Sequence, residues 1–229
     1  MKTWKGYNLI DLILLISGIV AVTVSGVLFG SKWYILVNTI MGLLCVFTQA
    51  KGKVLTQFFG VIHFIFYIYV SYTQNFYGEA LLYLLMLPMY IYGIIHWLAN
   101  RDKKDNVVIV REHLSKKEWI IFSVSLVIVS VGIYFLLKVL NTSLLIISTL
   151  SFVSMLPGLY LLMRRSKWNQ VAFLINDLIV PVLWIFLVAQ GDFSFLPMCI
   201  YHFFQMAYDV YGLFEWIKLE KKQKESIKN

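Results

Sequence analysis

The sequence predicts an all-α membrane protein with eight transmembrane helices, and three observations support this fold class. The 229 residues are 60% hydrophobic and only 14% charged, whereas a soluble domain has about 45–50% apolar and about 25% charged residues. The apolar runs are long enough for helices, which need ~20 residues to span a bilayer, while barrel strands would alternate over ~10 residues. The placement of the basic residues also fits eight helices.

The predicted helices follow one another with short connections, apart from the charged loop 100–117. They cover residues 8–29, 33–50, 54–74, 80–99, 118–140, 144–163, 168–190 and 194–217. The first run lacks a small-residue cleavage site after a short apolar stretch, so we expect a retained helix and not a signal peptide. Pro88, Pro157 and Pro181 lie inside predicted helices, where a proline bends or breaks the helix.

The basic residues predict the orientation. With the N-terminus inside, 18 Lys and Arg residues fall in cytoplasmic segments, and only Lys32 and Lys138 lie outside. Cytoplasmic loops are enriched in Lys and Arg, so both termini are expected in the cytoplasm. The net charge of +8 comes from loops and the C-terminal tail, which favours the lipid bilayer over nucleic acid as the partner.

The cysteines and histidines give no sign of a metal or catalytic centre. Cys45 and Cys199 lie in apolar runs and are expected to be buried free thiols. The four histidines have no ligand spacing. The sequence also lacks H-E-x-x-H, G-x-S-x-G and a phosphate-binding glycine loop. We therefore expect no enzyme activity, no metal and no cofactor.

An internal repeat organises the chain. The segment 92–97 (Y-G-I-I-H-W) closes the fourth predicted helix, and 211–216 (Y-G-L-F-E-W) closes the eighth, at an offset of 211 − 92 = 119. Helices two to four therefore resemble helices six to eight, the fifth links them in parallel orientation, and the first is extra. Parallel repeats are typical of transporters with a solute site at the repeat interface. The predicted division is an extra N-terminal helix (1–32), the first three-helix repeat (33–99), a basic cytoplasmic loop with the linker helix (100–143), the second three-helix repeat (144–217) and a basic cytoplasmic tail (218–229).

Polar residues concentrate in the second repeat. His202, Gln205 and Asp209 lie at i, i+3 and i+7 on one helical face, and Asn176 and Asp177 lie on the preceding helix. A charge at the bilayer centre costs at least ~2.5–3.5 kcal/mol on insertion scales and usually marks a pathway. We interpret these residues, with Trp184, as the lining of a solute site.

Several alternatives remain open at this point. Asp209 or Asp177 can instead pair with a helix neighbour, and His63 fits an interhelical hydrogen bond better than a ligand contact. Asn38 and Gln57, on the first repeat, fit a lining role or a structural role equally well. A passive channel and a non-transporting scaffold explain a single polar pocket less well than a carrier does, and a proton-coupled carrier stays open because the acids could titrate.

The sequence resembles the PnuC family of bacterial vitamin transporters from about Asn38 to Trp216. The resemblance rests on the order and spacing of several short motifs, which are Gly60, Tyr67, Phe76-Tyr77-Gly78-Glu79, Pro88, Tyr92-Gly93, Trp97, Trp168, Asn176-Asp177, Tyr211-Gly212 and Trp216. It implies a SWEET-like core of three, one and three helices in the inner membrane, a homotrimer, and facilitated diffusion of nicotinamide riboside, without ion or ATP coupling. Relatives carry thiamine or riboflavin instead.

The resemblance also suggests roles for the polar residues. A pyridinium ring gains about 0.5–2 kcal/mol over an aromatic face, so Trp184 is expected to stack on it, with Trp168 as a second wall. Asn176 and Gln205 would bind ribose hydroxyls or the carboxamide, and Asp177 or Asp209 would offset the positive charge. The family often has a second tryptophan three positions after Trp168, but this chain has Val171 there, which leaves the vitamin open.

Overall fold

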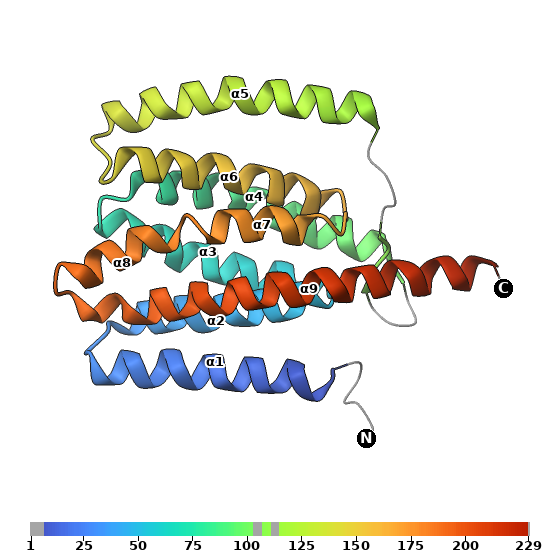
Figure 1. The fold of residues 1–229 in the computed structure, drawn as a ribbon, viewed down its shortest axis with the longest axis horizontal. Coiled ribbons are helices and arrows are strands. Elements are labelled where there is room, and N and C mark those ends of the chain that lie inside the picture. Colours follow the sequence, from blue (N-terminus) through green and yellow to red (C-terminus); the bar gives the residue numbers. More distant parts are fainter. Residues whose placement is uncertain (1–6, 103–106, 111–114, 229) are drawn as a thin grey trace.

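The computed structural model describes residues 7–102, 107–110 and 115–228, and in these ranges long helices lie side by side (Figure 1). This confirms the predicted helical class. The helices are α1 (Leu9–Leu28), α2 (Trp33–Ala50), α3 (Leu55–Thr73), α4 (Tyr77–Ala99), α5 (Lys116–Val139), α6 (Leu145–Met163), α7 (Asn169–Asp177), α8 (Pro181–Ala189) and α9 (Leu196–Lys228). A short 3-10 helix, η1 (Phe193–Phe195), precedes α9, and two short strands, β1 (Arg101–Asp102) and β2 (Val107–Val108), form an antiparallel hairpin.

Seven segments of the described chain are long and apolar enough to cross a membrane, namely α1 to α6 and the segment Asn169–Ala189. Helix α9 is not among them, because His202, Gln205, Asp209 and its charged C-terminal part dilute its apolar character. It nevertheless runs along the whole bundle, so that both chain termini lie at the same end (Figure 1). Within the predicted tail 218–229, α9 continues to Lys228.

The segment predicted as one helix over 168–190 is broken at residues 178–180. Pro181 has no N–H to donate to the carbonyl of Asp177, four residues earlier. The N–H groups of Ile179 and Val180 both bond the carbonyl of Asn176, at 2.8 and 3.0 Å. The break therefore places Asn176 and Asp177 at an interruption of a membrane helix, whereas Pro88 and Pro157 lie within the continuous helices α4 and α6.

The helices form two triplets with one helix on each flank. Helices α2, α3 and α4 pack together, as do α6, α7–α8 and α9, and the triplets meet where α2 contacts α9 and where α4 contacts α6. Helix α5 lies outside α6, and α1 lies on the opposite side against α2 and α9 (Figure 1). The main apolar core fills the space between the triplets.

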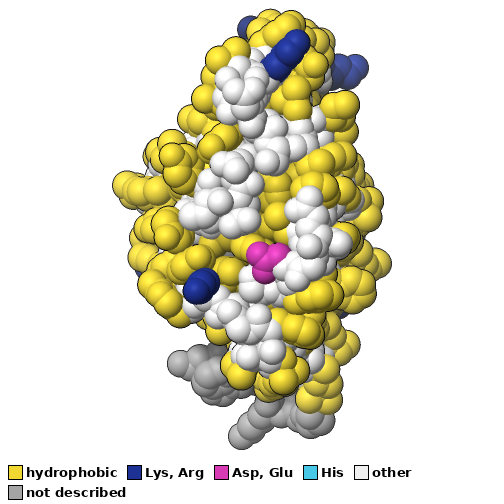
Figure 2. All heavy atoms as spheres, turned by 90° about the vertical axis from the view of Figure 1, so that its left-hand side faces the viewer, with side chains coloured by type: hydrophobic (Ala, Val, Ile, Leu, Met, Phe, Trp, Pro, Cys, Tyr) yellow, Lys and Arg dark blue, Asp and Glu magenta, His cyan; other side chains and the backbone are white. Residues whose placement is uncertain are grey.

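The two ends of the bundle differ in charge. We call the end that carries both termini the terminal end and the opposite one the distal end. At the terminal end Lys51 pairs with Asp11 and Glu215, and Gln223 of α9 bonds the backbone of Val108 and Val110 beside the hairpin. Figure 2 shows the distal end, whose surface is mostly hydrophobic or uncharged.

Two glycine contacts refine the repeat. A Cβ at Gly93 of α4 would meet the side chain of Gln57 of α3, and a Cβ at Gly212 of α9 would meet that of Gln170 of α7. The glycines are 212 − 93 = 119 residues apart, but the glutamines are 170 − 57 = 113 apart. The uniform offset of 119 is therefore wrong for the middle helix, because the second repeat has six more residues between these positions. Gln57 therefore corresponds to Gln170, whereas the offset of 119 would place it at the position of Asn176 (57 + 119 = 176).

Candidate transport site

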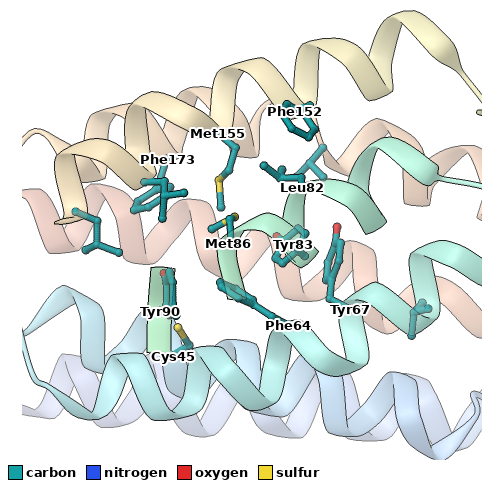
Figure 3. Packing of buried hydrophobic residues seen from close by; sticks show 14 of the residues in the cluster. Cys45, Phe64, Tyr67, Leu82, Tyr83, Met86, Tyr90, Phe152, Met155 and Phe173 are labelled. Atoms are coloured by element: carbon teal, nitrogen blue, oxygen red, sulfur yellow. The ribbon is translucent and has the colours of Figure 1, made fainter. Parts of the chain in front are cut away.

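A small cavity lies in the middle of the bundle, between the two triplets. Its volume is about 20 Å³, which is room for about one water molecule. Every triplet helix except α8 contributes to its wall. The lining residues are Cys45, Val46, Gln49, His63, Phe64, Tyr83, Tyr90, Met155, Phe173, Tyr201 and Gln205, and several of them are labelled in Figure 3. The cavity thus lies where the two triplets meet.

Two of the ten predicted site residues, His63 and Gln205, line this cavity. The Nδ1 atom of His63 lies 2.9 Å from the carbonyl of Asn38, so Nδ1 carries the proton and Nε2 accepts from the hydroxyl of Tyr201 at 3.3 Å. The Oε1 atom of Gln205 is buried and has no partner among the described residues. Gln205 therefore offers a free acceptor next to the cavity.

A hydrogen-bonded cluster lies one helical turn from the cavity toward the distal end. Its centre is the hydroxyl of Tyr67, which donates to Glu79 at 3.2 Å, accepts from Nε1 of Trp184 at 3.0 Å, and lies 3.4 Å from Nε2 of His202. A phenol has one proton and two lone pairs, so these contacts are satisfied if Nε2 of His202 is a donor. Trp184 and His202 are therefore joined through a residue of the first triplet.

Asp177 and Asp209 form a buried pair of acids. Their side chains are 0% and 2% exposed and are close enough to each other to interact. In the described chain both oxygens of Asp177 and one oxygen of Asp209 have no hydrogen-bond partner. The two acids lie on the packed helices α7 and α9, so they leave unpaired acceptor atoms inside the second triplet.

The remaining predicted residues have distinct places. Asn176 donates to the carbonyl of Ser151 and the hydroxyl of Ser154, at 2.8 and 3.0 Å. Nδ2 of Asn38 lies 3.2 Å from Sδ of Met198, and both amide atoms of Gln57 lack a described partner.

Trp168 differs from the other nine predicted residues. They are all buried, whereas Trp168 is 52% exposed near the terminal end, where Nζ of Lys167 lies 5.7 Å from its ring centre. Trp168 therefore lies on the surface and outside the cavity wall.

The sequence analysis missed Glu79 and the tyrosines around it. Glu79, Tyr83 and Tyr90 are buried and lie on one face of α4 at i, i+4 and i+11, and this face reaches the cavity through Tyr83 and Tyr90. The rings of Tyr67 and Tyr83 stack with centroids 4.0 Å apart (Figure 3). The helical spacing and the Phe76-Tyr77-Gly78-Glu79 run were signals that could have found them.

The acid pair leads to a stability prediction. Asp209→Asn is expected to leave the protein as stable as the wild type or slightly more stable, because it removes one of two neighbouring buried acids and its amide can donate to Asp177. Asp209→Ala leaves Asp177 without such a donor and is expected to destabilise by about 1–3 kcal/mol. Thermal unfolding of both variants in the same detergent measures the difference. Equal midpoints for the two variants would show that the carboxyl contact contributes nothing.

The family model described as nicotinamide mononucleotide transporter matches residues 32–218, which begin after α1 and end within α9. The chain belongs to this transporter family. A family of transporters, and not of enzymes, agrees with the absence of catalytic motifs in the sequence.

Curated relatives in the same family are similar along most of their length. The nicotinamide riboside transporter PnuC of Haemophilus influenzae is 28% identical over 228 residues, covering 96% of this chain and 93% of the relative. The nicotinamide riboside transporter PnuC of Neisseria mucosa is 26% identical over 196 residues, covering 83% and 74%. The crystal structure of a vitamin B3 transporter PnuC has a TM-score of 0.82 at 23% identity and covers 95% of this chain and 94% of that one. That similarity shows the fold.

Proposed function

We propose that this protein carries nicotinamide riboside across the bacterial inner membrane by facilitated diffusion. Family membership and the names of the two relatives support a carrier of this vitamin. The single observation that carries the proposal is the cavity at the interface of the two triplets, with polar and aromatic walls from both. A solute bound there touches both triplets, as alternating access requires.

The charges around the cavity favour a cation without a phosphate group. Glu79, Asp177 and Asp209 are buried on helices that line the cavity. No Lys or Arg occurs in α2, α3, α4, α6, α7 or α8, or in α9 before Lys218. A pyridinium ring suits acids and aromatic faces, whereas a phosphate needs cationic donors. Nicotinamide riboside is therefore a better substrate than nicotinamide mononucleotide, although the family description names the mononucleotide.

The predicted residues take the following roles in this proposal. Trp184 stacks on the ring, Gln205 and Asn176 bind ribose hydroxyls or the carboxamide, and the Asp177–Asp209 pair offsets positive charge. His63 and His202 orient the neighbouring tyrosines. Asn38 and Gln57 offer unpaired amide atoms from the first triplet to the solute. Trp168, which is exposed near the terminal end, contacts the solute only where it enters or leaves at that end.

The proposed architecture is a SWEET-like arrangement of three, one and three helices with α1 added in front. Trp97 and Trp216, at repeat-equivalent positions, have ring centroids 6.3 Å apart, as expected near a pseudo-twofold axis. The contacts of α2 with α9 and of α4 with α6 are likewise equivalent under the repeat. These pairs support the division into 1–32, 33–99, 100–143, 144–217 and 218–229, with the first and last segments outside the repeat.

Transport requires the triplets to move, because a cavity of about 20 Å³ is far smaller than ligand pockets of about 300–1,000 Å³. The described conformation is therefore occluded in this proposal, and rocking of one triplet against the other opens it to either side. The excess of Lys and Arg in the predicted cytoplasmic segments supports a cytoplasmic location for the terminal end, with both termini. The apolar outer face of α5 suits contact with lipid or with neighbouring subunits of a homotrimer.

The test is a binding and uptake experiment with the purified protein. We expect nicotinamide riboside to bind in calorimetry, and nicotinamide mononucleotide, thiamine and riboflavin to bind at least about tenfold more weakly. Asn176→Ala and Gln205→Ala should each weaken binding of the riboside by about tenfold. Uptake into proteoliposomes should persist after the proton gradient is collapsed.

Two outcomes would overturn the proposal. Tighter binding of thiamine or riboflavin would reassign the vitamin, and uptake that stops without a proton gradient would identify a proton-coupled carrier.

A further inference from the structure

Glu79 is a buried acid that joins the two triplets. It is 0% exposed, and its Oε1 atom accepts from the hydroxyl of Ser151 of α6 at 2.5 Å. Its Oε2 atom accepts from Tyr67 of α3 at 3.2 Å. Glu79 itself lies in the first turn of α4, so one carboxyl group connects three helices. Both partners are neutral hydroxyl groups.

No cation offsets this acid in the described protein. Glu79 is absent from the described ion pairs. The basic residues of the distal end, Lys32 and Lys138, have exposed side chains. A buried carboxylate without a counter-charge is costly, and charged groups inside a membrane protein usually serve the solute path. A cationic solute bound beside Glu79 would supply this counter-charge.

Aromatic rings surround Glu79 on the side of the cavity. Tyr67, its hydrogen-bond donor, stacks on Tyr83 with ring centroids 4.0 Å apart and meets Trp184 edge-on at 5.6 Å. Tyr83 lies one turn after Glu79 on α4 and lines the cavity. A carboxyl group next to several aromatic faces is the combination that binds a delocalised organic cation, since the ring faces and the acid both attract positive charge.

We propose that Glu79 is the charge-selecting residue of the transport site, which makes the carrier prefer a positively charged ring to an uncharged one of the same shape. This rests on the proposed function for the identity of the vitamin, but it assigns the selection to one residue. The Asp177–Asp209 pair is the competing candidate. That pair lies within the second triplet alone, whereas Glu79 bridges the two triplets through Tyr67 and Ser151.

The experiment compares nicotinamide riboside with its reduced form, dihydronicotinamide riboside, whose ring is uncharged and of nearly the same size. Binding of both to the purified protein is measured by calorimetry. The wild type is expected to prefer the cationic form by at least about tenfold. Glu79→Gln should lose most of this preference, mainly through weaker binding of the cation, while Glu79→Asp should keep it.

Two control variants separate charge from structure. Ser151→Ala removes a hydrogen bond to Glu79 but no charge, so its cation preference should equal that of the wild type. Asp177→Asn changes the competing acid site and should lower the preference much less than Glu79→Gln does. Thermal unfolding confirms that each variant is folded. If Glu79→Gln does not fold, Glu79→Asp is used for the test, and its preference for the cationic riboside should equal that of the wild type.

The outcomes are distinguishable. If the wild type binds neither form, the proposed function is wrong. If the wild type prefers the cation and Glu79→Gln keeps that preference, or if Asp177→Asn loses it instead, the assignment to Glu79 is overturned while the function stands. Loss of the preference in Glu79→Asp would also overturn it.

Discussion

Replacing Lys51 by methionine is expected to destabilise the protein by about 3–5 kcal/mol. Nζ of Lys51 lies 2.9 Å from Asp11 and 2.7 Å from Glu215, and its side chain is 8% exposed. It also donates to the hydroxyl of Tyr211 at 2.9 Å. Methionine preserves the length of the side chain but leaves two acids without their shared cation, one of them 1% exposed. The loss therefore comes from uncompensated charge and not from a cavity.

The pH dependence of the cluster of Lys51, Asp11 and Glu215 follows from the pKa of the lysine. Burial is the largest single influence and lowers the pKa of Lys51, but the hydrogen bonds with Glu215, Tyr211 and Asp11 together outweigh it, so the pKa is raised. A raised lysine pKa gives a stabilisation that is complete below the ordinary lysine value and is lost only as the pH rises through the raised value. The cluster should therefore stabilise the protein fully at neutral pH.

Lys218 provides the matched control. It also pairs with Glu215, at 2.8 Å, but its side chain is 72% exposed, so Lys218→Met should cost about 0–1 kcal/mol. Thermal unfolding in detergent at neutral pH should show a much lower midpoint for Lys51→Met than for Lys218→Met. If the two variants unfold together, the buried cluster does not hold α1, α2 and α9 as described.

The membrane helices could be predicted because the length of an apolar run almost determines a membrane helix. What lies outside the bilayer was harder to predict. The charged segment after Trp216 continues α9 with the help of the pairs Lys218–Glu215 and Lys224–Glu220, which hydropathy does not detect. The hairpin after α4 has strands of only two residues, too short for any alternation pattern.

The site was predicted in part, for a similar reason. His202, Gln205 and Asp209 stand out because they are polar residues in an apolar run. Glu79 was missed because the predicted helix began at residue 80, which placed this acid in a loop. The structure begins α4 at Tyr77 and buries Glu79 completely. From hydropathy alone, a charged residue near a helix end is expected to be exposed to solvent. Only its hydrogen-bond partners on other helices show that it is buried.

The contact between the triplets leads to the second large effect, the substitution Gly42→Ala. A Cβ on Gly42 of α2 would lie 2.5, 2.7 and 2.9 Å from three atoms of the Tyr201 side chain of α9, so either the ring or the helix must shift. Tyr201 is 2% exposed, its ring centroid lies 5.3 Å from that of His63, and it lines the cavity. We expect destabilisation by about 1–3 kcal/mol.

Gly132→Ala in α5 is the matched control, because a Cβ there meets nothing within 4 Å. Alanine favours a helix over glycine by about 1 kcal/mol, so this variant should be as stable as the wild type or slightly more stable. The same chemical change thus has opposite signs at the two positions. Thermal unfolding of both variants measures this difference directly.

Uptake of the vitamin should separate the two glycine variants further. Displacing Tyr201 changes the cavity wall and the α2–α9 junction together, so Gly42→Ala should lower uptake into proteoliposomes by at least about tenfold, whereas Gly132→Ala should not change it. A Gly42→Ala protein that transports normally would show that α2 and α9 separate easily at this level. The occluded state would then be held closed elsewhere, at the α4–α6 contact where Glu79 meets Ser151.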